Sequence, residues 1–205
     1  MIKKIVGLLL AVFVVQFSMA YVIENNRKGV QLWAGGPYWA ETNIGAQNSS
    51  DYGYYFWWGD TVGYKRVNGK WVASNGYSSN FSFDEASVPT YNKSYSTLKS
   101  QGWINSSGVL TSSHDAARVY WGSNWRMPTA SDLKNLMNKC TWTWTTKNGV
   151  YGYEVRGKGN YSGASIFLPA AGYGYGTSLN KSGVKGSLWS SVPNSSDSQV
   201  SWCLD

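Results

Sequence analysis

The chain has few charged residues for its length. Charged side chains make up 14% of its 205 residues, while hydrophobic ones make up 42%. Disordered proteins show the opposite balance, and the 23 glycines lack the period of three that a collagen helix requires. Both classes are therefore excluded, and the length predicts a single folded domain.

Long hydrophobic runs are also missing. The longest, residues 5–15, has about eleven residues, against the roughly 20 that cross a bilayer. Two lysines precede this run, and Ser18-Met19-Ala20 has the small-residue spacing of a signal peptidase site. We therefore predict a cleaved signal peptide over residues 1–20 and a mature domain over residues 21–205. This domain is expected to be secreted or held at the cell surface, without stable membrane insertion.

Clusters of positive charge are absent from the mature part. The formal net charge of +7 falls to +5 once Lys3 and Lys4 are removed with the signal peptide. Only Arg27-Lys28 and Lys65-Arg66 are adjacent basic pairs there, whereas nucleic-acid-binding proteins gather basic residues on one helix or stripe. We therefore expect no nucleic-acid partner.

Residue types that carry catalysis or bind metals are scarce. The single histidine, His114, cannot form a metal site or a catalytic triad without partners. The eleven carboxylates are dispersed, no Gly-x-Ser-x-Gly elbow is present, and nothing nominates a glycosidase pair. The sequence therefore predicts no catalytic residue, no metal site and no cofactor.

Only two cysteines are present, Cys140 and Cys203. In an oxidising compartment they could form a single disulfide. The alternative is two buried free thiols that act as small hydrophobic side chains. The sequence leaves both readings open.

Aromatic residues, by contrast, are in excess. The chain contains 12 Trp, 15 Tyr and 6 Phe, more than a core of this size normally needs to bury. Some Trp and Tyr side chains should therefore be exposed.

Two helices are expected. Thr129, which follows a proline, and Asp132 form a capping box that opens a helix over residues 130–139. Arg126 is expected to brace this turn through Asp132. A second capping box, Ser112 with Asp115, predicts a helix over residues 114–120. The buried face of the longer helix should carry Leu133, Leu136, Met137 and Cys140.

A β-hairpin gives the strongest strand signal. Thr and Trp alternate over residues 141–146, and Asn148-Gly149 separates them from a second run over residues 151–155. Trp142 and Trp144 should share one face and act as scaffold residues. Residues 68–108 are expected to form a long ordered loop region. Further strands are expected over residues 29–34, 52–58, 164–168, 187–191 and 199–204.

Four segments resemble a known family. They are DYGYYFWWGD (51–60), DAARVYWGSNWRMPTASDLKNLMNKCTWTWTTKNGVYGYEVRG (115–157), SIFLPAAGYGYGTSLNKSG (165–183) and LWSS (188–191). Over about residues 32–204 the chain resembles the Fibrobacter succinogenes major paralogous domain family, whose members are mostly exported proteins of gut and rumen bacteria.

That family is similar to the formylglycine-generating enzyme and to the C-type-lectin-like fold. The resemblance implies an α+β domain with two helices packed on small antiparallel sheets and long loops. It implies no catalytic residue, because the family has no established biochemical role. Members usually continue past the stretch matching residues 200–204 into a last strand that pairs with the N-terminal one. We therefore expect either that residues 199–204 take over this pairing or that the chain is truncated at its C-terminus.

We therefore expect the chain to be a non-catalytic recognition module that binds glycans. Exposed Trp and Tyr offer rigid flat faces, while Asn, Ser and Gly supply adaptable polar contacts. The alternative is an adhesion or structural protein that recognises another protein, such as one on a host cell surface, and an enzyme is the third choice.

In lectin-like domains, recognition lies in the loops after the second helix, here about residues 161–189. The candidate ligand-binding residues are Tyr173, Tyr175, Trp189, Asn180 and Lys181, with Trp57, Trp58 and Trp71 as a second set. The oligomeric state is left open.

Overall fold

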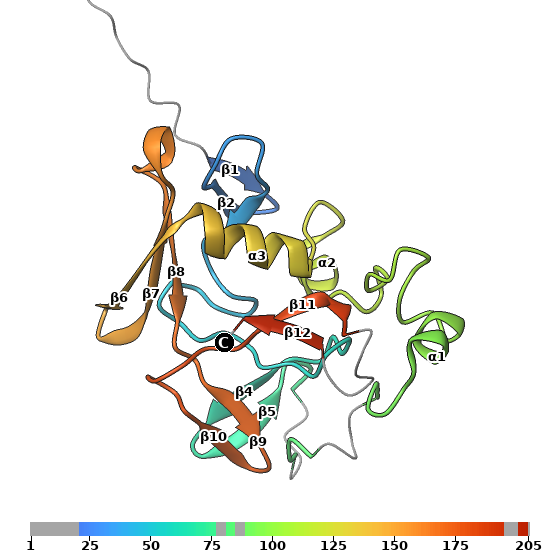
Figure 1. Cartoon of the computed structure of the whole chain (residues 1–205). Coiled ribbons are helices and arrows are strands. Elements are labelled where there is room, and N and C mark those ends of the chain that lie inside the picture. The colour runs from blue at the N-terminus through green and yellow to red at the C-terminus, as the bar shows by residue number, and fades with distance from the viewer. Residues whose placement is uncertain (1–20, 77–80, 85–88, 195–200, 205) are drawn as a thin grey trace, which may run out of the picture.

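The computed structural model describes residues 21–76, 81–84, 89–194 and 201–204, the last of these by its backbone alone. In this part of the chain, short antiparallel sheets and three short α-helices are joined by long connections (Figure 1). The fold class is therefore α+β, as the sequence predicts. The predicted signal peptide lies outside the described residues.

The first sheet is formed locally by the start of the described chain. Asn25 and Asn26 have positive φ angles of 49° and 58° and make the tight turn between the first two strands. The strand predicted over residues 29–34 therefore begins earlier in the structure, at Arg27, and ends at Gln31. The sheet has the order β1 (Tyr21–Glu24), β2 (Arg27–Gln31) and β3 (Tyr38–Ala40).

The C-terminal strand does not pair with the N-terminal one. β12 (Ser201–Leu204) pairs with β11 (Leu188–Pro193), while β1 pairs with β2 along one of its edges. The first of the two alternatives is therefore wrong for the described residues 201–204, and the other, a C-terminal truncation, stays a prediction. The Asn25-Asn26 turn instead brings β2 beside β1 as its partner.

The predicted loop over residues 68–108 contains regular structure and is a second correction. β4 (Tyr64–Val67) and β5 (Lys70–Ala73) form a hairpin around Asn68-Gly69, whose φ angles are 49° and 75°. This is the same Asn-Gly turn that predicts the later hairpin. A short helix, α1 (Tyr95–Ser100), begins at Ser94, whose hydroxyl accepts a hydrogen bond from the Thr97 amide. The run over residues 52–58, expected as a strand, contributes only the isolated bridge between Tyr55 and Tyr64.

The two predicted helices are present, with different accuracy. α3 (Ala130–Lys139) has the predicted bounds, and its capping box is formed because Thr129 and Asp132 exchange hydrogen bonds between side chain and backbone. α2 (Ala116–Trp121) begins later than predicted. Its first turn is capped by Asp115, whose carboxylate accepts from the Arg118 amide, so Ser112 does not act as the cap.

The largest sheet has the order β6-β7-β8 and lies at the left in Figure 1. The predicted hairpin is confirmed, with Trp144 directly opposite Tyr153. Its strands are β6 (Thr141–Lys147), β7 (Val150–Arg156) and β8 (Ser165–Pro169), and a 3₁₀ turn, η2 (Gly159–Tyr161), precedes β8. Below this sheet in the figure, β9 (Tyr173–Tyr175) and β10 (Ser178–Asn180) form a further hairpin.

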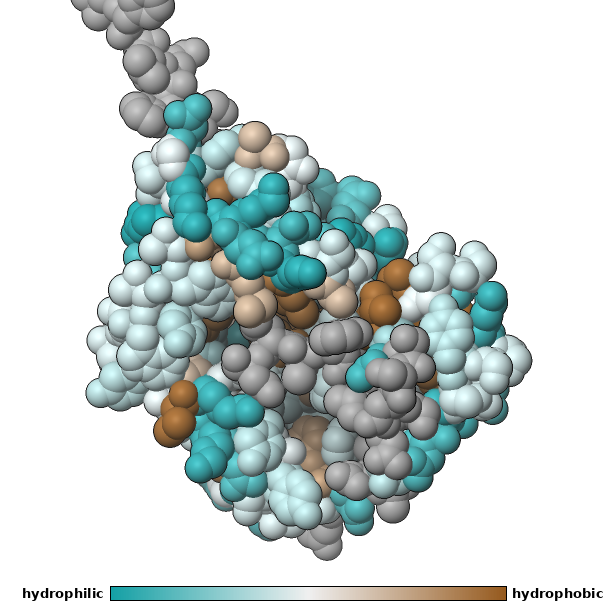
Figure 2. Space-filling model, viewed as in Figure 1, coloured by the Kyte–Doolittle hydropathy of each residue, from teal (hydrophilic) through white to brown (hydrophobic). Residues whose placement is uncertain are grey.

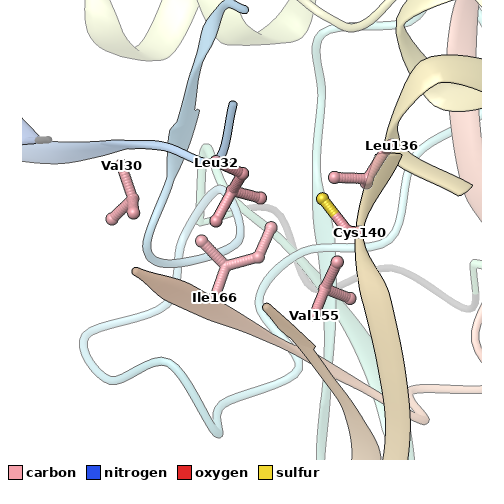
Figure 3. Packing of buried hydrophobic residues seen from close by; sticks show 6 residues of the cluster. All are labelled: Val30, Leu32, Leu136, Cys140, Val155 and Ile166. Carbon is pink, nitrogen blue, oxygen red and sulfur yellow. The ribbon is translucent and has the colours of Figure 1, made fainter. Parts of the chain in front are cut away.

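The main core cluster joins the N-terminal sheet, α3 and the large sheet. Its side chains point toward one another in Figure 3, and they are Val30, Leu32, Leu136, Cys140, Val155 and Ile166. Two further clusters centre on Trp58, Leu98, Ile104 and Leu110, and on Ala117, Trp121 and Trp125. Three tryptophans, Trp58, Trp121 and Trp125, are buried members of these clusters.

One residue of the predicted buried helix face is on the surface. Leu133, Leu136 and Cys140 are buried, but Met137 is 54% exposed because it lies at the border of the helix face that contacts the core. Cys140 is a buried free thiol, and burial raises the pKa of that thiol. The side chain of Cys203 lies outside the described residues.

Candidate functional site

The hairpin β9–β10 presents two of the predicted ligand-binding tyrosines on one face. Because side chains alternate along a strand, Tyr173 and Tyr175 point to the same side while Gly174 points to the other. The two rings are 38% and 65% exposed. They are thus the kind of surface aromatic pair that the sequence predicts for this segment.

A close approach of the backbone explains why these tyrosines face outward. On the inner side of β9, a Cβ atom at Gly174 would lie 2.4 Å from Cδ2 of Phe83, and Phe83 is buried. Glycine therefore lets the strand lie directly on the Phe83 ring. The inner side is filled, so both tyrosines are left on the solvent side.

Polar groups surround the two rings. In the β9–β10 register, Ser178 is opposite Tyr175 and Asn180 is opposite Tyr173, so both polar side chains share the tyrosine face. The ammonium of Lys185 lies 5.6 Å from the centre of the Tyr173 ring, a cation–π distance. Lys181 is exposed in the turn that follows β10, with a φ of 57°. We call Tyr173, Tyr175, Ser178 and Asn180 the tyrosine face.

The remaining candidates serve the core. Trp58 and Trp71 are buried, so these predicted contact residues have no ring face for a ligand, which is a correction. Trp57 packs edge-on against Phe83 at 5.0 Å. Trp189 is half-buried against the second cluster, and its indole N–H donates to the Phe56 carbonyl at 3.0 Å. Their burial follows from long-range packing that local sequence patterns do not encode.

A groove that the sequence analysis missed lies beside the large sheet. It has a volume of about 570 Å³. One wall is aromatic and belongs to the sheet, and the other is the segment that leads into β11. We call it the aromatic groove, and its lining includes Trp142, Trp144, Tyr153, Leu168, Val184 and Lys185.

The aromatic wall was predicted, but its role was assigned to the scaffold. Trp142 does have that role, because its indole N–H donates to the Leu136 carbonyl of α3 at 3.2 Å. Trp144 lies two residues further along β6, beyond the helix, and it is 42% exposed. In Figure 2 this hairpin is pale, since Trp, Tyr and Thr rank near the middle of the hydropathy scale. The signal that could have found the groove is the length of the alternation, which continues past the end of the core.

A smaller cavity of about 340 Å³, with charged residues in its lining, lies near β4. Its charged groups are engaged in bracing the loops around it. Asp51 accepts from the amides of Gln47 and Asn48, and the Asn48 amide is the main cause that lowers the pKa of Asp51. Lys65 donates to the Gly45 carbonyl, and Arg66 donates to the Thr177 carbonyl. We therefore assign this cavity to the scaffold.

The conspicuous carboxylates near the helices also support the fold. Asp115 is 1% exposed and accepts from the backbone amides of Arg118 and Met127; burial raises the pKa of this carboxyl. The Arg126 guanidinium forms an ion pair with the Asp132 carboxylate at 2.7 Å. The brace predicted for Arg126 is therefore present. Both carboxylates tie the Trp125–Pro128 turn to the helices.

His114 likewise has a structural environment. Its imidazole stacks on Trp103, with ring centres 3.9 Å apart, and Nδ1 lies 3.2 Å from the Gly59 carbonyl oxygen. Among the described residues, no three His, Cys, Asp or Glu side chains are grouped as a metal site. No helix in this part of the chain is long and apolar enough to span a bilayer.

Comparison of the chain with protein-family models, with curated proteins and with solved structures gives no match. The resemblance to the Fibrobacter succinogenes major paralogous domain family, and the lectin-like fold that it implies, therefore stay predictions.

Proposed function

We propose that this chain is an exported, non-catalytic recognition module with a C-type-lectin-like fold that binds glycans at the tyrosine face. The observation that carries the proposal is the exposed pair Tyr173 and Tyr175, flanked on the paired strand by a hydroxyl and an amide. Export is supported by the signal-peptide pattern of residues 1–20.

The chemistry of this face suits a sugar ring. A pyranose has one apolar face of C–H groups and a rim of hydroxyls. A tyrosine ring can cover the apolar face, and it loses little entropy because only two side-chain torsions are fixed. Ser178 and Asn180 can exchange hydrogen bonds with the hydroxyls, since each has both donors and acceptors.

Rigidity also favours recognition. The strand that carries the tyrosines lies directly on the buried ring of Phe83, and the turn between β9 and β10 is joined to β4 by the Arg66 guanidinium, which donates to the Thr177 carbonyl. A ligand would therefore meet a preformed surface, which reduces the entropy cost of binding.

A glycan-array screen of the exported chain tests the proposal. Tyr175→Ala and Tyr173→Ala should each weaken binding by about 1 kcal/mol or more, because each removes a contact ring, while the melting temperature stays nearly unchanged. Tyr38→Ala is the matched control, since Tyr38 is also exposed but belongs to the N-terminal sheet.

Two results would count against glycan recognition. If both tyrosine variants lose stability but keep their affinity, the rings belong to the scaffold. If no glycan binds and a cell-surface protein does, the alternative of protein adhesion replaces the proposal.

A further inference from the structure

The aromatic wall of the groove is rigid although it is exposed. Trp144 and Tyr153 are paired residues of β6 and β7, and their rings lie 5.0 Å apart at 72°. Tyr151 stacks nearly parallel to the Trp144 indole, at 6.1 Å and 11°. Each ring is thus held by another ring, so the wall keeps its shape without being buried.

This wall is the outer end of a sheet face whose inner end belongs to the core. Val155 and Ile166 lie on the same face and are fully packed under α3. Further out on that face come Tyr153 and Leu168, which pair across β7 and β8. The apolar face therefore runs without a break from the core into the groove.

The opposite wall is fixed by its backbone. The Gly183 amide donates to the Ala170 carbonyl at 2.7 Å, and the Gly172 amide donates to the Lys185 carbonyl at 2.7 Å. Gly172 and Gly186 also form a parallel bridge. These contacts hold the segment that carries Val184 at a set distance from the sheet.

The groove adjoins the tyrosine face. Gly172, which is bonded to the groove wall, directly precedes Tyr173 in the chain. Lys185 lines the groove, and its ammonium lies 5.6 Å from the Tyr173 ring centre. One ribbon of chain therefore separates the two surfaces, and a ligand longer than one sugar unit could occupy both.

We propose that the aromatic groove and the tyrosine face form one extended site for a linear oligosaccharide, with the groove as the subsite that recognises chain length. This inference rests on the proposed glycan function and deepens it, because it names a chain and not a single terminal sugar as the ligand. The groove volume of about 570 Å³ falls within the range of ligand pockets, roughly 300–1,000 Å³.

The wall chemistry favours a sugar chain over a purely apolar ligand. Trp142, Trp144 and Tyr153 provide ring surfaces along one wall, while the continuation of the site carries a hydroxyl and an amide. A linear glycan alternates apolar ring faces with hydroxyls along its whole length. A lipid chain would leave the polar part of this site unmatched.

Titration calorimetry with oligosaccharides of increasing length tests the inference. The probes are cello-, manno- and α-1,4-galacturono-oligosaccharides, each from disaccharide to hexasaccharide. We expect affinity in one series to rise with length, because longer chains reach the groove. Trp144→Ala should weaken the hexasaccharide about tenfold and leave the disaccharide unchanged, while Tyr175→Ala should weaken both.

Trp144→Phe and Tyr38→Ala serve as controls. The first keeps a ring in the groove and should retain most of the length effect, and the second should retain all of it. A measurement on the unmodified chain avoids any effect of Trp144→Ala on folding. The indole N–H NMR signal of Trp144, identified by its loss in Trp144→Phe, should shift with the hexasaccharide and not with the disaccharide.

The two proposals fail in different ways. If glycans bind with the same affinity at every length, and if the Trp144 signal does not respond to the hexasaccharide, the extended site is wrong and the tyrosine face alone remains. If no oligosaccharide binds, the glycan function fails and the extended site fails with it.

Discussion

Gly174 and Phe83 are in direct contact, with the backbone of β9 lying on the buried phenylalanine ring. Replacing Gly174 with alanine would place a Cβ 2.4 Å from Cδ2 of Phe83. We expect Gly174→Ala to lower the free energy of unfolding by about 1–3 kcal/mol, because overpacking forces the ring or the strand to move. Urea denaturation measures this change.

The matched control is Gly163→Ala. Gly163 has no heavy atom within 4 Å of a Cβ built at its position, and it has no positive φ. The Gly163→Ala variant should be as stable as the unmodified chain or slightly more stable. Equal stability of the two variants would mean that β9 does not lie on Phe83, and the outward orientation of the tyrosines would lose its explanation.

A second prediction concerns the start of α3. Thr129→Ala removes the hydroxyl that accepts from the Asp132 amide at 3.1 Å. The expected loss is about 1 kcal/mol of stability, as for other N-cap threonines. Ser131→Ala, in the same exposed first turn, should have little effect in a thermal melt. An unchanged melting temperature for Thr129→Ala would contradict the capping box.

The third prediction is a pH dependence at the same turn. Burial alone would raise the pKa of Asp132, but hydrogen bonds from Arg126 and Thr129 hold it below its ordinary value. A carboxylate of this kind stabilises the fold above the unfolded pKa of about 4, and the contribution is lost as pH falls through the lower folded value. Asp132→Asn should therefore melt below the unmodified chain at pH 7.

This difference should shrink as the pH is lowered below about 4, because the carboxyl is then protonated in the unfolded chain and, at lower pH, in the folded chain as well. Ser131→Ala should show no such convergence. If the difference in melting temperature between Asp132→Asn and the unmodified chain stays constant down to low pH, the charge of Asp132 contributes nothing to stability.

A fourth prediction is that glycan binding does not depend on divalent cations. The sequence lacks the calcium motifs of sugar-binding C-type lectins, and the tyrosine face has no carboxylate among its residues. Calorimetry in EDTA and in calcium should therefore give the same affinity. Binding that disappears in EDTA and returns with calcium would require carboxylate ligands, for example Asp197, which lies outside the described residues.

Local sequence signals predicted α3 and the β6–β7 hairpin accurately. Both depend on residues within a few positions of each other: Thr129 with Asp132, and the alternation around Asn148-Gly149. The same local rule applies to the β4–β5 hairpin, whose Asn68-Gly69 turn lies in a polar stretch.

The site was predicted only in part, for a physical reason. Composition predicted Tyr173 and Tyr175 as contact residues in a loop, but not that they share one face of a strand or which side of β9 the protein would cover. That depends on Phe83, some ninety residues away. Trp71 and Trp144 illustrate the same limit, since similar indole side chains became core and surface through contacts between distant segments.

The parallel bridge between Gly172 and Gly186 has a consequence for how such a site can diversify. Main-chain hydrogen bonds at Gly172 and Gly183 hold the spacing of the groove. Residues such as Val184 can therefore be exchanged without moving the wall. A library randomised at Val184 and Met137 should retain folded members in high proportion, so this framework could be adapted to different sugars by selection at its two rims.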